Sequence, residues 1–329
     1  MKEEIIKTNK AWNDGHIPQV SIITSNYNRR EVLLRCMKSV EAQTFKDIEY
    51  IVVDNGSSVS FDDIMSDFME STSIPVMFIK RSSGLGPHTG RNSAIRQARG
   101  QYLSMIDSDD EYLPNAMEVL VKAWNDIPTD KRNEYREVVA LCQNEFGQLL
   151  GQKFPSNINQ LSRKETRLIC LKPEYQCEHA NMSRTVLLKE NPFQEPEGVN
   201  YVSELAVWYK LDKFYKSYYL DDIVKRYYTG SSDSITNHDI KKVTLQGCCN
   251  IMWDNLYLLN HWEDYELPFT NRLKRVMYYS EMRYVLKSKG EYPKYKWMET
   301  PLKGTVNSLL SVLLYLPSVY KAKKLLKEI

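Results

Sequence analysis

Residues 102–110 read YLSMIDSDD, an apolar run that ends directly in three aspartates and a serine. The apolar run predicts a buried β-strand, so the acidic residues follow its carboxyl end. Three similar runs precede it, VSIIT at 20–24, YIVVD at 50–54 and VMFIK at 76–80, and segments with helical spacing separate them. Apolar strands that alternate with helices predict an α/β fold, a parallel Rossmann-type sheet covered on both faces. Ligands bind such sheets at the carboxyl ends of the strands.

The alternation of strand and helix stops near residue 126. Beyond it, VVALCQNEFGQLL at 138–150 reads as two strands joined by a hairpin turn at NEFG, and a helical pattern begins after Ser232. The chain has 329 residues, more than one compact core usually holds. We therefore expect three segments, with bounds 1–125, 126–235 and 236–329.

Composition excludes several classes of protein. A net charge of +2 is too weak to indicate nucleic acid as a partner. The six cysteines have no C-x-x-C spacing, which predicts reduced thiols rather than a zinc site or a disulfide framework. The first residues contain no apolar run of signal-peptide length, and the longest apolar stretch, Leu309 to Leu316, is too short to cross a bilayer. A cytoplasmic location is expected.

The acidic cluster Asp107-Ser108-Asp109-Asp110 predicts a cation site. Crowded carboxylates repel one another unless a cation joins them, and hard oxygen ligands suit Mg²⁺ or Mn²⁺. Mg²⁺ usually takes only one or two protein carboxylates and completes its shell with phosphate oxygens and water. The alternative is an acidic turn that caps the next helix.

A glycine-rich segment precedes the strand that carries this cluster. GLGPHTGRN at 84–92 places Gly86 before a predicted helix and Arg91 in its first turn. Backbone amides and a cation at such a helix opening can bind phosphate, although most openings of this kind are ordinary loops. The helix is expected to end at Gly100 as its C-cap.

These motifs resemble glycosyltransferase family 2, inverting enzymes with the GT-A fold. The resemblance rests on four blocks, at 20–45, 49–57, 84–114 and, more weakly, 201–211. It implies a metal-dependent transferase that uses a nucleotide-sugar, most simply a UDP-sugar. The acceptor would be a saccharide or a lipid-linked saccharide of bacterial surface polysaccharide synthesis.

The resemblance also implies roles for residues at the first two strand ends. Ser25 and Tyr27 would contact the nucleotide base, with Tyr27 stacking on it. Asp54 or Asn55 would meet the edge of the base; many relatives have two aspartates there, so which of the two reads the base stays open. Arg91 would approach the diphosphate.

In the acidic cluster, the resemblance implies that Asp107 contacts the ribose or the sugar and that Asp109 ligates the metal. Ser108 and Gly86 would line the same nucleotide site, and Asp110 has a less definite part. The three segments then become a nucleotide-sugar subdomain, an acceptor and catalytic subdomain with a mixed sheet, and a helical C-terminal region.

An inverting transfer needs one general base. Relatives often carry a carboxylate a few residues before an aromatic residue in the acceptor subdomain, and here Glu204 precedes Trp208 in that register. Glu204 is therefore the predicted base, with a glutamate that merely starts a helix as the alternative. His179 is the second candidate. A metal-binding histidine of relatives is replaced by Gly230, and His238 lies eight residues later.

The last segment, TVNSLLSVLLYLPSVYKAKKLLKEI at 305–329, joins an apolar half to a lysine-rich end. It could lie on an anionic membrane surface, which would place the protein at the inner face of the cytoplasmic membrane, or pack on the catalytic body. Two rivals to the transferase hypothesis are a sugar-phosphate nucleotidyltransferase and a degenerate transferase that binds nucleotide-sugar without catalysis. The loop SNYNRR at 25–30 lacks the glycine-rich signature of the first rival.

Overall fold

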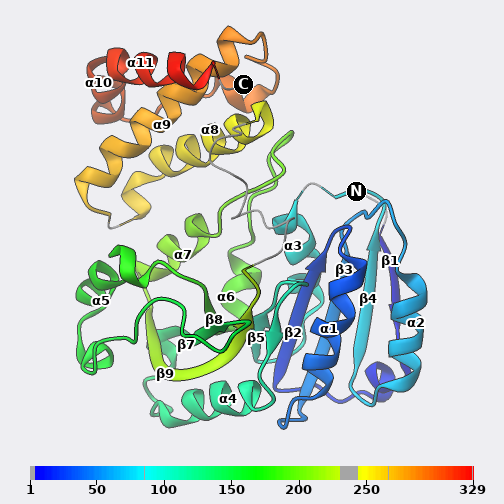
Figure 1. Ribbon diagram of the computed structural model, residues 1–329. Coiled ribbons are helices and arrows are strands. Elements are labelled where there is room, and N and C mark those ends of the chain that lie inside the picture. Colours follow the sequence, from blue (N-terminus) through cyan, green and yellow to red (C-terminus); the bar gives the residue numbers. More distant parts are fainter. Residues whose placement is uncertain (1–3, 85, 230–243, 266, 328) are drawn as a thin grey trace. The chain divides into compact units, whose positions relative to one another are not determined.

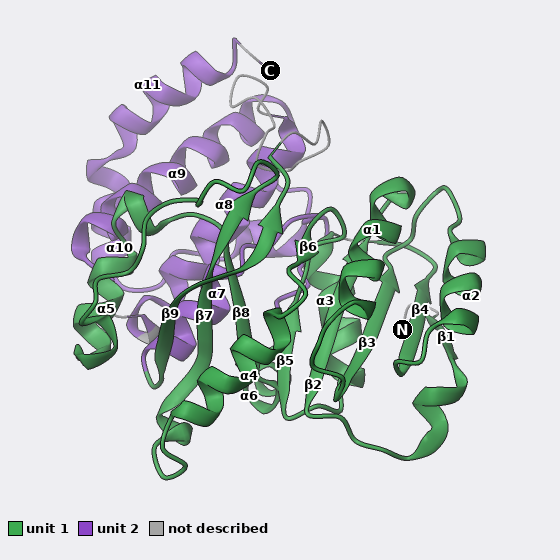
Figure 2. Ribbon diagram, turned by 60° about the horizontal axis from the view of Figure 1, so that its bottom comes forward, with its two compact units in different colours: residues 1–192, 214–234 green, residues 193–213, 235–329 purple. Residues whose placement is uncertain are grey.

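The computed structural model divides the chain into two compact units (Figure 2). Unit 1 comprises residues 1–192 and 214–234, and unit 2 comprises residues 193–213 and 235–329. This division differs from the three predicted segments. The residues that the structure describes are 4–84, 86–229, 244–265, 267–327 and 329.

Unit 1 is built on one nine-stranded mixed sheet (Figure 1). The strand order is β1-β4-β3-β2-β5-β8-β7-β9-β6, and β4, β3, β2 and β5 are parallel to one another, as predicted. β8 pairs antiparallel with β5, so the sheet runs without a break from the first predicted segment into the second. The strands are β1 (Glu4–Thr8), β2 (Val20–Asn26), β3 (Ile48–Asp54), β4 (Val76–Arg81), β5 (Tyr102–Met105), β6 (Glu111–Tyr112), β7 (Tyr135–Asn144), β8 (His179–Arg184) and β9 (Lys216–Tyr227).

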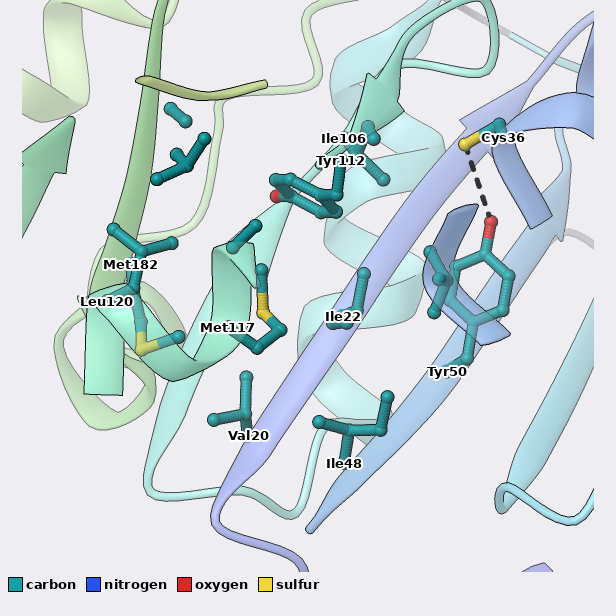
Figure 3. Packing of buried hydrophobic residues seen from close by; sticks show 14 of the residues in the cluster. Val20, Ile22, Cys36, Ile48, Tyr50, Ile106, Tyr112, Met117, Leu120 and Met182 are labelled. Atoms are coloured by element: carbon teal, nitrogen blue, oxygen red, sulfur yellow. Dashed lines mark hydrogen bonds between the residues drawn. The ribbon is translucent and has the colours of Figure 1, made fainter. Parts of the chain in front are cut away.

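Helices cover both faces of the parallel part of the sheet. α1, α2 and α4 bury their apolar residues in one cluster with alternate strand residues such as Ile22 and Tyr50 (Figure 3). The Tyr50 hydroxyl lies 3.7 Å from the Cys36 sulfur of α1, within this cluster. α3 packs on β2 and β3 from the other face. The helices of unit 1 are α1 (Arg30–Glu41), α2 (Asp62–Ser71), α3 (Pro87–Gln97), α4 (Ala116–Asp126), α5 (Arg163–Cys170) and α6 (Thr185–Glu190).

Two local predictions have different outcomes. The predicted turn at NEFG is present, and a hydrogen bond from the Gly147 N–H to the Asn144 carbonyl at 3.0 Å closes it. The prediction that Gly100 caps α3 is wrong: the helix ends at Gln97 with Ala98 as its C-cap. A Cβ on Gly100 would stand 2.6 Å from the Ser21 nitrogen, so this glycine permits a close approach to β2 instead.

Unit 2 is helical, as predicted for the C-terminal region. Its core is a cluster that includes Met252 and Trp253 of α8 and Val276 and Val285 of α9. Among the described residues, no helix has both the length and the apolar character required to cross a membrane. The helices are α7 (Leu205–Asp212), α8 (Leu245–Asn260), α9 (Phe269–Ser288), α10 (Thr305–Leu313) and α11 (Tyr315–Leu325).

Candidate active site

The carboxyl ends of β2, β3 and β5 meet at one edge of the sheet, as the sequence predicted. In the β2–β3 register, Ser25 pairs with Val53 and Asn26 with Asp54. The chain continues from β5 into the acidic cluster, with the Ile106 N–H bound to the Ile23 carbonyl at 3.0 Å. The structure therefore gathers the predicted donor residues of unit 1 at this edge.

The acidic cluster forms a turn closed by a 3.1 Å hydrogen bond from the Asp110 N–H to the Asp107 carbonyl. Ser108 is buried in it, with 3% of its surface exposed. Each aspartate faces a different cation: Asp107 lies 2.9 Å from Arg91, and Asp109 lies 2.5 Å from Arg29. The third pair joins Asp110 to the buried Lys225 at 3.3 Å.

The three carboxylates have different pKa values because burial and neighbouring charges act differently on each. Burial raises the pKa of Asp107, but Arg91 and other nearby cations outweigh it and hold the pKa below the ordinary value. Burial together with the charge of Asp107 raises the pKa of Asp109, despite Arg29. Burial raises the pKa of Asp110 to about 7, with Lys225 opposing the shift. Negative charge at Asp109 and Asp110 is thus incompletely compensated.

This donor set fits a divalent cation that is shared with phosphate. Among the described residues, no group of three or more His, Cys, Asp or Glu side chains is arranged to hold a metal alone. Asp109 and Asp107 offer hard oxygen ligands, and Mg²⁺ or Mn²⁺ can complete its shell with diphosphate oxygens and water. The raised pKa of Asp109 shows a carboxylate for which added positive charge would be favourable.

Sequence reasoning missed Arg29 and Lys225. Arg29 is the residue that precedes α1 and lies in the SNYNRR loop, where its position directly after a strand end was an available signal. Lys225 lies in β9 with 3% of its side chain exposed, 2.5 Å from Glu178 as well as beside Asp110. Nothing in the local sequence marks a lysine as buried, because its partners come from distant strands.

A further group outside the predicted set surrounds the same turn. Arg35 of α1 donates to the Asp109 carbonyl at 2.5 Å, and its guanidinium lies 3.5 Å from the ring centre of Tyr228. The Tyr228 hydroxyl donates to Glu111 at 2.8 Å, and its N–H donates to Asp110 at 3.3 Å. The end of β9 is therefore bound to the acidic turn.

Asn55 is held by protein groups on both sides of its amide. Its Nδ2 donates to the Gly86 carbonyl at 2.7 Å, and its Oδ1 accepts from Arg81 at 2.6 Å. Arg81 also lies 3.4 Å from Glu4 of β1. Asp54 uses one oxygen, Oδ1, to accept the Ser57 N–H at 2.8 Å, and this bond caps the turn after β3. Of the two, Asp54 has the less committed side chain.

Tyr27 lies on the surface at the end of β2, with 56% of its residue surface exposed. The next residue, Asn28, has a φ of 54°, which asparagine tolerates better than most residues. Its N–H donates to the Ser57 hydroxyl at 2.9 Å, and its side-chain oxygen accepts the Ser58 N–H at 2.8 Å. These bonds tie the loops after β2 and β3 together and leave the Tyr27 ring open for stacking.

Gly90 of α3 packs directly on Ser25, and a Cβ at this position would stand 2.1 Å from the Ser25 Oγ. Gly90→Ala is expected to lower the free energy of unfolding by about 1–3 kcal/mol through overpacking. It should also weaken UDP binding, because Ser25 or α3 has to move. Chemical denaturation and calorimetry would measure both. The double variant Gly90→Ala/Ser25→Ala removes the hydroxyl and keeps the Ser25 Cβ, 3.0 Å from the added methyl group, so it should recover part of the lost stability. No recovery at all would contradict a clash with the hydroxyl.

The predicted base Glu204 belongs to unit 2, whereas the donor residues belong to unit 1. Glu204 directly precedes α7, and its Oε2 accepts from the Trp208 indole at 3.2 Å. The second candidate, His179, stacks on Phe154 with ring centres 5.2 Å apart, and burial lowers its pKa. The predicted positions Gly230 and His238 lie outside the described residues.

Known sequences are similar to this chain. Residues 21–131 match the model of Glycosyl transferase family 2. A GalNAc(5)-diNAcBac-PP-undecaprenol beta-1,3-glucosyltransferase of Campylobacter jejuni is 27% identical over 221 residues, 67% of this chain and 68% of that protein. A putative colanic acid biosynthesis glycosyl transferase of Escherichia coli is 30% identical over 131 residues, 39% of this chain and 45% of that protein.

Solved structures share the fold. S. aureus TarS 1-349 in complex with UDP-GlcNAc is 14% identical with a TM-score of 0.54, over 94% of this chain and 81% of that one. The mannosyltransferase PcManGT of Pyrobaculum calidifontis in complex with GDP-Man and Mn²⁺ is 14% identical with a TM-score of 0.51, over 95% and 86%. The predicted GT-A-like fold is thus confirmed, and residues 21–131 of the chain are similar to glycosyl transferase family 2.

Proposed function

We propose that this protein transfers one sugar, with inversion, from a UDP-sugar to a saccharide or lipid-linked saccharide in bacterial surface polysaccharide synthesis, with Mn²⁺ or Mg²⁺ as cofactor. The observation that carries the proposal is the single sheet edge that combines the Asp107–Asp110 turn, Arg91 and the exposed ring of Tyr27. The name of the Campylobacter jejuni relative, which denotes a lipid-linked glycan, and the UDP-GlcNAc bound by TarS support it.

Each donor residue has a part that its chemistry suits. Tyr27 stacks on the base, and the uncommitted oxygen of Asp54 accepts from the base edge. Arg91, the fifth residue of α3, binds the diphosphate, because a guanidinium matches two phosphate oxygens at once. Asp107 turns toward the ribose or the sugar, and Gly86 and Ser108 line the nucleotide site beside it.

Asp109 would hold the metal against the diphosphate. A bound divalent cation neutralises the charge that develops as the nucleoside diphosphate leaves. Arg29 has the complementary task of holding the Asp109 carboxylate in place at 2.5 Å. Lys225 offsets part of the negative charge of the turn, since its buried ammonium lies 3.3 Å from Asp110.

Glu204 is the proposed general base, which takes the acceptor hydroxyl proton during attack. Two neighbouring contacts fix its segment: the Ser203 N–H donates to Asp254 at 3.2 Å, and the Trp208 indole binds the Glu204 carboxylate. The indole N–H binds one oxygen of the Glu204 carboxylate. This hydrogen bond fixes the orientation of the carboxylate, and the second oxygen remains available to accept a proton.

Glu204→Gln is expected to lower kcat by about 10²–10⁴-fold while leaving UDP affinity unchanged, because an amide cannot accept the proton. Steady-state rates with a measured donor and acceptor would test it, with Glu299→Gln, an exposed glutamate of the same unit, as the control. A variant with a near-normal rate would redirect the search to His179.

We also propose that α10 and α11 bind the surface of an anionic membrane and bring the enzyme to a lipid-linked acceptor at its cytoplasmic face. Val312 and Leu316 are exposed by 74% and 76%. Lys323 and Lys324, in the last turn of α11, are exposed as well. Apolar side chains beside lysines are typical of helices that lie in a membrane interface.

Val312→Ser/Leu316→Ser is expected to reduce cosedimentation with phosphatidylglycerol vesicles by about tenfold or more, since each apolar side chain loses its transfer free energy. The control Ile17→Ser/Val59→Ser changes two residues of unit 1 that are 68% and 59% exposed. Equal loss in both variants, or none in the first, would assign α10 and α11 to packing.

The experiment that tests the activity itself is a donor screen. Nucleotide release is measured with UDP-, GDP- and dTDP-sugars in Mn²⁺, because slow hydrolysis reports the donor without an acceptor. Metal-dependent UDP binding without release from any donor would favour a degenerate transferase that only binds nucleotide-sugar. Release of pyrophosphate from a nucleoside triphosphate and a sugar phosphate would favour a nucleotidyltransferase.

A further inference from the structure

A pocket of about 630 Å³ opens in unit 1 at the amino end of β5, the end opposite to the acidic turn. Its lining comes from four places in the sequence: residues 96–102, Trp124, residues 132–133, and residues 184–186 with Lys189. Tyr102 and Trp124 form its floor as a stacked pair with ring centres 4.6 Å apart. None of these residues belongs to the donor site described above.

The lining of the pocket is strongly cationic. Five of its fourteen residues are arginine or lysine, and none is acidic. Arg96 and Arg99 are neutralised by Glu4 and Glu49, at 3.2 and 2.7 Å. Across the described residues, the other three cations have no carboxylate within 4.0 Å; they are Arg132, Arg184 and Lys189.

Backbone carbonyls hold two of these cations in place. Arg132 donates from Nε to the Ile127 carbonyl at 3.0 Å and from Nη2 to the Asn125 carbonyl at 3.2 Å. Arg184 donates from Nη1 to the Asn133 carbonyl at 3.3 Å. Both charges act on the pocket floor: burial raises the pKa of Tyr102, and both guanidinium groups oppose that shift. The cations are thus positioned before any ligand arrives.

Two buried polar atoms at the pocket lack a hydrogen-bond partner among the described residues. They are the Thr185 Oγ1 and the Arg99 Nη2. Thr185 is only 5% exposed. Buried polar groups are nearly always hydrogen-bonded, so these two atoms are exceptions in the wall of the pocket.

We infer that this pocket binds a compound with two or more phosphate groups, at a site separate from the donor site. Three uncompensated cations match the charge of a diphosphate, and guanidinium groups bind phosphate oxygens in pairs. The volume is that of a small-molecule site. The phosphates could come from a soluble metabolite or from lipid headgroups, and the experiment separates these sources.

The test is calorimetric titration with inorganic pyrophosphate in EDTA, which removes metal from the donor site. Saturable binding is expected, weakened about tenfold or more in Arg184→Gln/Lys189→Gln. Lys172→Gln, an exposed lysine of the same unit, should bind as wild type. Arg91→Gln, which removes the donor-site cation, should also keep the affinity. Lys189→Gln alone, at an exposed position, gives a smaller loss if the double variant does not fold.

Vesicles of phosphatidylglycerol then identify the source. A double variant that cosediments as well as wild type assigns the pocket to a soluble phosphate compound, and one that cosediments less assigns it to headgroups. Absence of saturable pyrophosphate binding overturns the inference. So does binding that Arg91→Gln abolishes, because the ligand then lies in the donor site. Equal loss in Lys172→Gln would mean that only the net charge matters.

Discussion

Asp109→Ala is expected to abolish metal-dependent UDP binding, with a loss of affinity of at least 10²-fold in Mn²⁺. The residue supplies a carboxylate in a desolvated turn, and the charge of Asp107 and burial raise its pKa. Added positive charge is favourable there, so a cation bound with UDP would gain most from this side chain. Titration calorimetry of UDP with Mn²⁺ and with EDTA measures the metal-dependent part directly.

Two controls sharpen that result. Asp67→Ala removes an exposed aspartate of α2 in the same unit and should leave UDP binding unchanged. Arg29→Gln removes the guanidinium that lies 2.5 Å from Asp109, and it should retain Mn²⁺-dependent binding because the carboxylate remains. UDP affinity in Mn²⁺ that is equal for wild type and Asp109→Ala would remove Asp109 from the metal site.

Lys225→Met is expected to lower the free energy of unfolding by about 3–5 kcal/mol at pH 8. The ammonium lies 3.3 Å from Asp110 and 2.5 Å from Glu178, and its side chain is only 3% exposed. Without it, the buried Asp110 keeps its desolvation cost and loses its cation, and Glu178, whose side chain is 38% exposed, loses its partner. Urea unfolding, followed by circular dichroism, would give the difference.

The pH dependence separates charge from packing in this variant. Burial raises the pKa of Asp110 to about 7, above its value in the unfolded chain, so its ionised form is unfavourable in the fold. At pH 5 Asp110 is protonated and needs Lys225 less, and the loss should therefore be smaller than at pH 8. An equal loss at both pH values would indicate packing alone.

An exposed ion pair provides a reference for the loss of free energy of unfolding in Lys225→Met. Lys122→Met removes a lysine that is 72% exposed and forms an i,i+4 pair with Asp126. Its loss should cost no more than about 0.5 kcal/mol. The contrast between positions 122 and 225 would show that burial, rather than the presence of an ion pair, decides the cost.

The parallel strands and the donor edge could be predicted because their signals are local. Continuous apolar runs such as YIVVD are buried on both faces, and a parallel sheet brings all their carboxyl ends to one edge. Ser25, Asp54 and Asp107 therefore came together without knowledge of any contact. The sequence blocks indicated the family as well, because the same sheet sets the spacing between them.

The rest depends on contacts between residues far apart in the sequence. Lys225 reads as an exposed lysine until β9 places it beside Glu178 and Asp110. Gly100 follows a helix, as a C-cap glycine would. The position requires glycine because β2 approaches it too closely for a Cβ atom, and this contact has no local sequence signal. The hydrogen bonds of Asn55 to Arg81 and Gly86 require the segment after β3 to lie against the end of β4 and the loop that follows it. Tertiary pairing of this kind has no periodic signal in the chain.

The contact between β1 and Arg81 links the start of the chain to the motion of the donor loop. Glu4 lies 3.4 Å from Arg81, which in turn donates to Asn55 at 2.6 Å and to Thr89 at 2.5 Å. β1 is the edge strand of the sheet, and an edge strand opens at less free-energy cost than a central one. Each fraying event at β1 would release Arg81 and loosen the loop that Asn55 holds at Gly86. Amide exchange in the two segments should therefore share one opening rate, although Asn55 and Gly86 lie 51 and 82 positions after Glu4 in the sequence.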